Sequence, residues 1–188
     1  PDGYYGSYFD ESKLGTLKEF VKNGGKIIAL ANALQIFSDN DSFSLKQKTQ
    51  EQEDTNNELL PYNMRERQST NDFIIGSIFK TTLDTSHPLA FGYKNTYNSL
   101  KLSADAYQFL DSGYNVGYIN GTAQNISGFA GKNALPNQDN TRVFGEERLG
   151  KGSILYMVDN PMFRSFWENG KLLLVNAIFY VNNSKVRI

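Results

Sequence analysis

The pattern that most constrains the fold lies near the start of the sequence, where an amphipathic segment precedes a glycine stop and a short apolar run. Apolar residues recur at helical spacing from Glu11 to Lys22, which predicts a helix that Gly24 and Gly25 end. The run KIIAL that follows is typical of a strand buried on both faces. ANALQIF can then open another helix. This alternation predicts an α/β fold in which helices cover a mostly parallel sheet.

The second half of the sequence is rich in short strand candidates. One runs from Phe73 to Leu83, and YNSLKL, GYNVGYI and NISGFAG are three more. The segments Thr141–Glu147 and Ser153–Val158 flank a glycine-containing turn, which predicts an antiparallel hairpin late in the chain. GKLLLVNAIFYV closes the chain as a predicted helix that is apolar on most faces, so we expect it to be well buried.

The composition is that of one globular domain. The chain has 188 residues, of which 39% are hydrophobic and 21% charged, and this is enough for one sizeable core. The formal net charge of −1 argues against nucleic acid and anionic membranes as partners. No apolar run approaches the ~18 residues that a membrane-spanning helix needs.

Two parts of the single domain 1–188 differ from the rest. Residues 38–72 are polar and rich in Gln, Asn and Glu, which predicts a surface insertion, either a solvated excursion or a loop that covers a site or binds a partner. PDGYYGSYFD at the start reads like the loop that follows a strand. We therefore expect the chain to be a fragment of a longer protein that lacks its first strand or strands.

The sequence lacks the side chains of the common catalytic and metal sites. It has no cysteine and a single histidine, His87, whereas a zinc site needs three or four ligands, usually several of them His or Cys. We therefore predict no metal and no catalytic residue, and a structural role for His87. Glu146 and Glu147 are adjacent on a predicted strand, so their side chains face opposite ways and cannot cooperate directly.

The turn after KIIAL is where an α/β enzyme would hold a nucleophile. It carries Ala31, Asn32 and Ala33, and none of these side chains attacks a carbonyl group. Asn32 can either cap the helix that follows or donate a hydrogen bond to a ligand.

Ligands of open α/β sheets bind at the carboxyl ends of the strands, and three segments of this sequence are expected there. They are PDGYYGSY, ANAL and DNPMFRSFWEN. The candidate ligand-binding residues that they supply are Tyr4, Tyr5, Asn32, Asp159, Asn160, Arg164, Trp167 and Glu168. Aromatic faces, amides and one arginine suit a sugar or a peptide.

Two other interpretations of these residues stay open. In the first, Arg164 pairs with Glu168 or Asp159 while the nearby aromatic residues cover the edge of the sheet, and the segment is structural. In the second, Asp159 and Glu168 converge and act as the general acid and base of a hydrolase.

Several strings together resemble a known family. KNGGKIIALANAL, HPLAFGY and DNPMFRSFWENGKLLLVNAIF follow one another as in the C-terminal domain of a group of large bacterial zinc carboxypeptidases. That domain is similar to class I glutamine amidotransferases, and the resemblance covers nearly the whole chain except the insertion. It implies a three-layer, flavodoxin-like sandwich with a mostly parallel sheet.

The resemblance does not imply catalysis by this chain. Class I amidotransferases use a cysteine after a strand and a later His-x-Glu, and zinc carboxypeptidases use a His-x-x-Glu pair and a further histidine; neither set is present. What the resemblance implies is a non-catalytic accessory domain of a secreted or periplasmic zinc carboxypeptidase. This domain would support the peptidase domain of the same polypeptide or its substrate binding, and zinc is expected only in that catalytic domain. The alternative is a module that binds a sugar or peptide at the carboxyl edge of the sheet.

Overall fold

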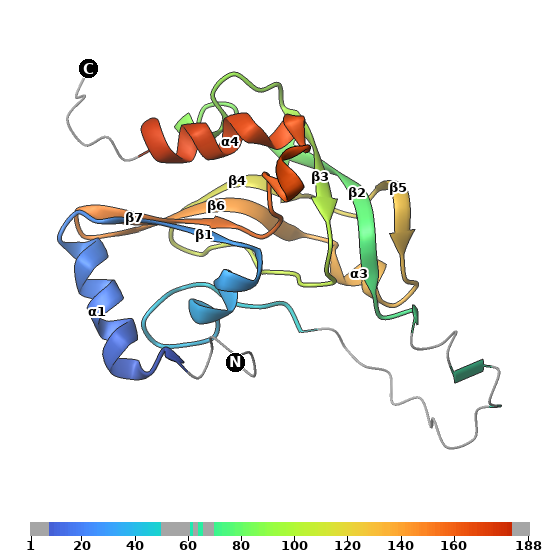
Figure 1. The fold of residues 1–188 in the computed structure, drawn as a ribbon, viewed down its shortest axis with the longest axis horizontal. Coiled ribbons are helices and arrows are strands. Elements are labelled where there is room, and N and C mark those ends of the chain that lie inside the picture. The colour runs from blue at the N-terminus through green and yellow to red at the C-terminus, as the bar shows by residue number, and fades with distance from the viewer. Residues whose placement is uncertain (1–7, 50–60, 62–63, 66–69, 182–188) are drawn as a thin grey trace.

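The computed structural model describes residues 8–49, 61, 64–65 and 70–181, and these form a curled sheet with helices packed on it (Figure 1). The strands are β1 (Lys26–Leu30), β2 (Ile74–Leu83), β3 (Thr96–Lys101), β4 (Tyr114–Ile119), β5 (Asn125–Ala130), β6 (Thr141–Leu149) and β7 (Gly152–Met157). The α-helices are α1 (Glu11–Lys22), α3 (Ala134–Asn137) and α4 (Glu168–Phe179), and the 3₁₀ helices are η2 (Ala31–Ile36), η4 (Pro88–Ala90) and η5 (Phe163–Ser165).

The sheet is mostly antiparallel, so the predicted parallel, flavodoxin-like sandwich is wrong. The strand order is β1-β7-β6-β4-β2-β3, with β5 also paired to β2. Only β1 and β7 run parallel, and the other described pairs are antiparallel. Parallel neighbours need a long crossover connection, usually a helix. The single αβ alternation at the start of the sequence does not recur, and from β2 to β7 no long helix separates successive strands.

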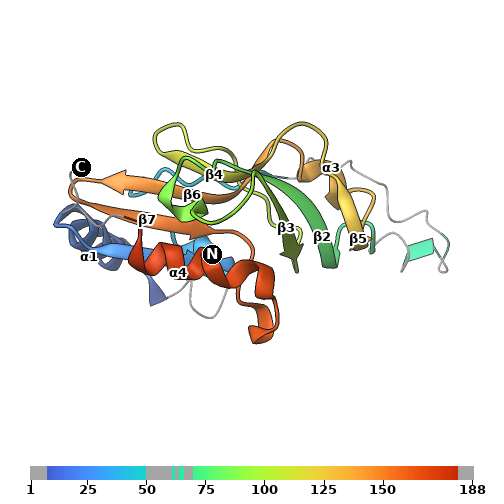
Figure 2. The ribbon, with the colours of Figure 1, turned by 90° about the horizontal axis from the view of Figure 1, so that it is seen from above.

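The sheet curls into a half-barrel around β2 (Figure 2). One edge of β2 pairs with β3, while the other edge pairs with β5 at its start and with β4 at its end. The β2–β5 ladder shifts register between Ile75 and Ser77, where Gly76 and Gly128 both have positive φ. Bulges of this kind increase the local twist, and β2, β3 and β5 run at a steep angle to β1, β7 and β6 (Figure 1).

Local elements agree with the sequence predictions. The helix from Glu11 to Lys22 and the strand from Lys26 to Leu30 have the predicted bounds. The predicted late hairpin is the antiparallel pair of β6 and β7. These elements depend on periodicity and on glycine stops, which act between residues close in sequence.

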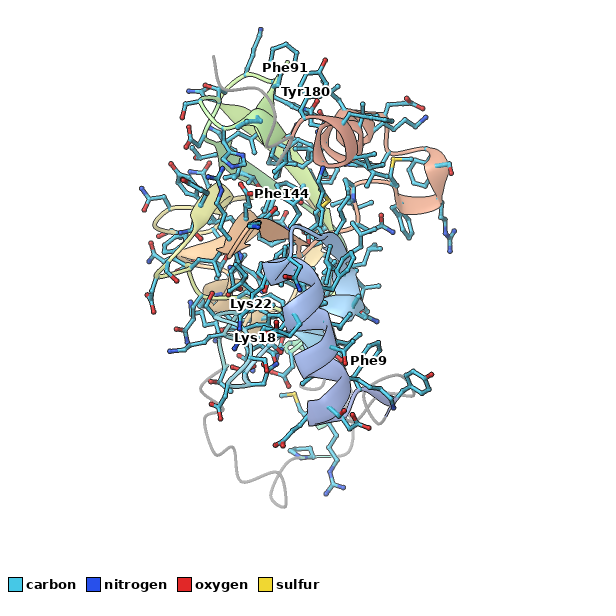
Figure 3. All side chains as sticks on the ribbon, turned by 90° about the vertical axis from the view of Figure 1, so that its left-hand side faces the viewer. Phe9, Lys18, Lys22, Phe91, Phe144 and Tyr180 are labelled. Atoms are coloured by element: carbon cyan, nitrogen blue, oxygen red, sulfur yellow. The ribbon has the colours of Figure 1, made fainter. Side chains whose placement is uncertain are left out.

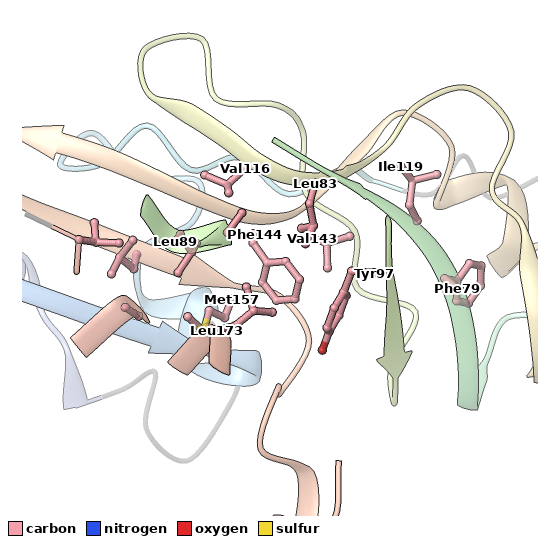
Figure 4. Close-up of a cluster of buried hydrophobic side chains, with 14 of the residues drawn as sticks. Phe79, Leu83, Leu89, Tyr97, Val116, Ile119, Val143, Phe144, Met157 and Leu173 are labelled. Carbon is pink, nitrogen blue, oxygen red and sulfur yellow. The ribbon is translucent and has the colours of Figure 1, made fainter. Parts of the chain in front are cut away.

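Two hydrophobic cores lie on opposite faces of the sheet. Leu155 and Met157 of β7 belong to the core under α4 and η4 (Figure 4), and Ile154 and Tyr156 belong to the core under α1 and η2. The alternation follows from the two-residue period of a strand. Because β7 is buried on both faces, it reads as a continuous apolar run.

Residues 38–48 carry part of the second core. Phe43 and Leu45 are buried there beside Phe37. The backbone N–H of Ser44 donates to the Glu147 carboxylate on β6. The first part of the predicted insertion therefore supplies core residues, and most of the remainder lies outside the described residues.

Helix α4 is buried on one face only, so the prediction of a well-buried helix is wrong. Leu173 and Ala177 pack fully against the sheet. Leu172, Val175 and Ile178 are exposed by 38%, 43% and 45%. No described helix has both the length and the apolar character that a membrane crossing requires.

Candidate functional site

Two of the three predicted segments meet at one edge of the sheet. Because β1 and β7 are parallel neighbours with Leu30 opposite Met157, residues 31–32 and 158–160 leave the sheet side by side. Tyr4 and Tyr5 lie outside the described residues. The carboxyl edge of the β1–β7 pair is thus the part of the predicted site that the structure describes.

The backbone at this edge holds several non-glycine residues in the left-handed region. Ala31, Arg164 and Ser165 have φ of 47°, 48° and 59°, a conformation that costs free energy for residues with a Cβ. Ala31 forms a sharp strand-to-helix turn of the kind that presents a nucleophile in α/β hydrolases, but its side chain is a methyl group. Asn32 is exposed and does not cap η2, whose N-cap is Leu30 without a side-chain hydrogen bond. The capping interpretation of Asn32 is therefore wrong.

Asp159 is buried and fully engaged by β3. Its carboxylate accepts a hydrogen bond from Lys101 Nζ at 3.1 Å and another from Ser99 Oγ. Lys101 and Ser99 are 2% and 1% exposed. The curl of the sheet makes this contact possible, because β3 and β7 are not neighbours in the strand order. Both carboxylate oxygens of Asp159 are therefore engaged by donors from β3.

Trp167 lies beside the same group of side chains. Burial raises the pKa of Tyr97 on β3, the nearby Trp167 indole lowers it in part, and the charge of Asp159 raises it further. Tyr97, Ser99 and Lys101 share the buried face of β3 because they are two residues apart. The structure therefore brings Asp159 and Trp167 into one group.

Sequence reasoning missed the three β3 residues. The spacing of Tyr97, Ser99 and Lys101 marks a common face, but lysine is almost never fully buried unless it is paired. The partner, Asp159, is far away in sequence. The pattern therefore carried only a weak signal, and only the tertiary fold shows which face is inside.

The remaining predicted residues do not join this group. Asn160 accepts a hydrogen bond from Met162 N at 2.9 Å and shapes the turn. Arg164 is exposed, with its guanidinium 5.2 Å from the centre of the Phe163 ring. The Glu168 side chain is 76% exposed and pairs with Lys171.

The positions of Asp159, Arg164 and Glu168 contradict two interpretations of the segment DNPMFRSFWEN. Among the ion pairs of the described residues, Asp159 pairs with Lys101 and Glu168 with Lys171, so Arg164 does not hold these carboxylates. Asp159 is buried against β3 whereas Glu168 points into solvent, so the two do not form an acid–base pair. The structure offers no support for a hydrolase that uses them.

Glu146 and Glu147 lie on opposite faces of β6, as predicted. Glu146 Oε2 is 2.9 Å from His87 Nε2 on the α4 side. Glu147 accepts a hydrogen bond from Tyr156 Oη at 2.7 Å on the α1 side. His87 has the structural role predicted for it, because it caps η4 through its ring.

No group of three or more His, Cys, Asp or Glu side chains within the described ranges is arranged to hold a metal ion. That this chain binds no zinc and needs no cofactor stays a prediction.

Comparison with known proteins leaves the family open. The sequence matches no protein-family model and no curated protein. Among solved structures, the chain is similar to the cytoplasmic protein STM3548 from Salmonella typhimurium, with 13% identity and a TM-score of 0.43. The match covers 93% of this chain but only 62% of the Salmonella protein, so the chain spans less than two thirds of that protein's length. We draw no conclusion on fold or function from this similarity.

Proposed function

We propose that this chain is a non-catalytic domain that docks on a neighbouring protein domain of the same polypeptide through the outer face of α4. The observation that carries the proposal is the exposure of Leu172, Val175 and Ile178 at a spacing of three residues. From Leu172 to the end of α4 the helix contains no charged residue. A helix that is apolar on both faces is normally covered on both, and the sheet covers one.

Aromatic side chains continue this surface at the end of α4. Phe91 and Tyr180 are stacked, with ring centres 5.3 Å apart and planes inclined by 18°, and both are more than half exposed (Figure 3). Aromatic residues are enriched at protein interfaces and charged residues are depleted at their centres. An exposed apolar surface of this composition suits a protein partner.

The candidate site supports the non-catalytic part of the proposal. Asp159, the buried carboxylate at the carboxyl edge, is held by Lys101 and Ser99. Ala31 occupies the sharp turn after β1 without a reactive group. The hydroxyl that meets this carboxylate, that of Ser99, is only 1% exposed and so is closed to a substrate.

The sequence resemblance suggests one particular neighbour, the catalytic domain of a zinc carboxypeptidase. The fold implied by that resemblance is wrong, so this suggestion now rests on the strings HPLAFGY and DNPMFRSFWENGKLLLVNAIF alone. If the neighbour is such a peptidase, this domain supports it or its substrate binding, and the protein is secreted or periplasmic.

A cysteine-reactivity experiment tests the docking surface. The chain has no cysteine, so Val175→Cys places one reactive thiol on the outer face of α4. Ser12→Cys is the matched control on the exposed side of α1. In the full-length protein as encoded, we expect the thiol at 175 to react with maleimide at least tenfold more slowly than in the isolated chain, and the thiol at 12 at an unchanged rate. Equal rates at 175, or a reading frame that encodes no other domain, contradict the proposal.

A second candidate function is a sugar- or peptide-binding module at the carboxyl edge. The left-handed backbone at Ala31 and Arg164, together with the exposed side chains of Asn32 and Phe166, favours it because strained residues cluster at binding sites. Trp167 is the only tryptophan, so its fluorescence reports on this edge. A saturable change in Trp167 fluorescence with a glycan or short peptide supports the binding module. Unchanged fluorescence across a broad panel contradicts it and leaves the docking domain as the proposed function.

A further inference from the structure

His87 joins η4 to the sheet through both ring nitrogens. Nδ1 accepts a hydrogen bond from Leu89 N at 3.2 Å, and Nε2 lies 2.9 Å from Glu146 Oε2. The side chains of His87 and Glu146 are 6% and 0% exposed. Since Nδ1 accepts from an N–H group, it carries no proton in this arrangement. The ring is therefore the neutral tautomer with its proton on Nε2, donated to Glu146.

The turn that His87 caps supports α4. Leu89 and Ala90 of η4 are fully buried in the core beneath the helix. The Asn176 side chain of α4 donates hydrogen bonds to the carbonyl oxygens of Leu89 and Phe91, at 3.0 and 2.8 Å. A change in the conformation of η4 therefore reaches α4 through the Asn176 side chain.

Charged and titratable groups surround the His87 ring on several elements. Glu146 contacts it from β6, and Asp84 lies close enough in the preceding turn to interact with its charge. The Tyr114 ring of β4 is 5.3 Å from the imidazole. Arg148 approaches Glu146 from the same strand, with Nε 3.4 Å from Oε1, and the charge of Lys26 on β1 also reaches Glu146. Two carboxylates and two cations therefore surround the ring and its partner Glu146.

We propose that His87 is an acid-sensitive latch that releases η4, and with it α4, when the ring takes up a proton from solvent. The proton can be added only at Nδ1, because Nε2 already carries one. Protonated Nδ1 is a hydrogen-bond donor, and so is the N–H of Leu89 that faces it. Two donors cannot form a hydrogen bond with each other. The Leu89 bond breaks while the Nε2 bond to Glu146 persists, so the ring stays on the sheet and η4 detaches from it. This inference does not depend on the proposed docking function.

Hydrogen exchange measured through the His87 titration tests the latch. The chain has one histidine, so a single imidazole resonance followed by NMR from about pH 8 to about pH 5 reports the protonation of His87 directly. After correction for intrinsic exchange, we expect the Leu89 amide to lose at least tenfold of its protection as His87 protonates. The α4 amides near Asn176 should follow, and the α1 amides should not change.

His87→Asn is the matched variant, because asparagine also accepts a hydrogen bond at an N-cap but does not titrate. In this variant we expect the protection of Leu89 to be independent of pH over the same range. The latch is overturned if Leu89 keeps its protection in the wild-type chain while His87 protonates, or if His87 stays neutral down to pH 5. Both of these outcomes are measured on the wild-type chain, so they test the proposal even if the variant fails to fold.

Discussion

Lys101 and Asp159 form a buried ion pair, with Nζ 3.1 Å from Oδ1, that joins β3 to the end of β7. Both side chains are less than 10% exposed, and the hydroxyl of Ser99 completes the coordination of the carboxylate. The pair closes the curled sheet at the point where a ligand site was predicted. It accounts for the presence of a buried carboxylate at this edge.

Breaking this pair from one side should be strongly destabilising. Asp159→Asn leaves the Lys101 ammonium buried without a counter-charge, and we expect the free energy of unfolding to fall by about 3–5 kcal/mol. Urea denaturation measures the change. Glu168→Gln, which breaks the exposed pair with Lys171, is the control and should cost at most about 0.5 kcal/mol. Equal losses in the two variants would refute a stabilising role for the buried pair.

Arg142 is a buried cation that the surrounding residues do not satisfy. It is 1% exposed, and none of its guanidinium nitrogens has a hydrogen-bond partner in the described part of the chain. Its guanidinium carbon lies 5.2 Å from the centre of the Tyr156 ring. Burial lowers the pKa of Arg142 to about 10, so the group remains charged at neutral pH.

Replacing Arg142 by an apolar residue should therefore stabilise the chain. We expect Arg142→Met to raise the free energy of unfolding by about 1–3 kcal/mol, since it removes an unpaired buried charge. Thermal and urea denaturation both report the change. Arg142→Lys keeps the charge and should bring no gain. A loss of stability in the Met variant would contradict this prediction and would show that the Tyr156 ring and the charge of Glu147 outweigh the cost of burying the guanidinium.

Stability below about pH 5 should depend on Glu146. Burial alone would raise the pKa of this carboxyl, but the hydrogen bond from His87 and the charge of Arg148 outweigh it, so the pKa lies below its usual value of 4.5. A carboxylate with a lowered folded-state pKa stabilises the chain above the unfolded pKa, and this stabilisation disappears as the pH falls through the folded pKa.

The matched variant for this effect is Glu146→Gln, which keeps an acceptor for His87 but does not titrate. Between about pH 5 and about pH 3, we expect the free energy of unfolding to fall more steeply in the wild type than in this variant. Urea midpoints at closely spaced pH values measure the two slopes. Parallel slopes would show that Glu146 has the same pKa in the folded and unfolded chain.

Lys26 ties the C-terminus of α4 to β1. Its Nζ donates to the carbonyl oxygens of Ala177 and Ile178, at 3.0 and 2.9 Å, and a cation is favourable at the C-terminal end of a helix. We expect Lys26→Met to cost about 1 kcal/mol and to speed hydrogen exchange in the last turn of α4. Lys22→Met removes an exposed partner of Glu19 and should leave that turn unchanged. Equal hydrogen-exchange rates in the last turn of α4 in the two variants would show that Lys26 does not stabilise the end of this helix in solution.

The error in the predicted fold has two sources, the local pattern at residues 11–30 and the family resemblance, which implies a mostly parallel sandwich as well. The helix–glycine–strand pattern at residues 11–30 predicts a parallel sheet, but among the named strands only β1 and β7 pair in parallel. The directions of β2, β3 and β4 follow from ladders between residues such as Ser77 and Lys101, which are distant in sequence. Periodicity reports that a strand exists and which residues share a face, but it does not report the partner strand or the direction in which the two run.

The candidate site likewise has one part that the sequence predicts and one part that it does not. Residues 31–32 and 158–160 do meet at one edge because β1 and β7 are neighbours. Within that edge the alternative in which Arg164 pairs with Asp159 is wrong, since the partner of Asp159 is Lys101 on β3. Lysine is usually exposed, so no local pattern marks Lys101 as buried.

The sequence by itself determined the local elements and the absence of cysteine. The local elements are α1, β1, the β6–β7 hairpin and the opposite orientation of Glu146 and Glu147. These follow from the covalent geometry of neighbouring residues and from composition. Only the tertiary structure decided that the sheet curls, that Lys101 is buried against Asp159 and that α4 leaves one apolar face uncovered. Those features depend on which distant segments pack together, and the free energy of that packing is a property of the whole chain.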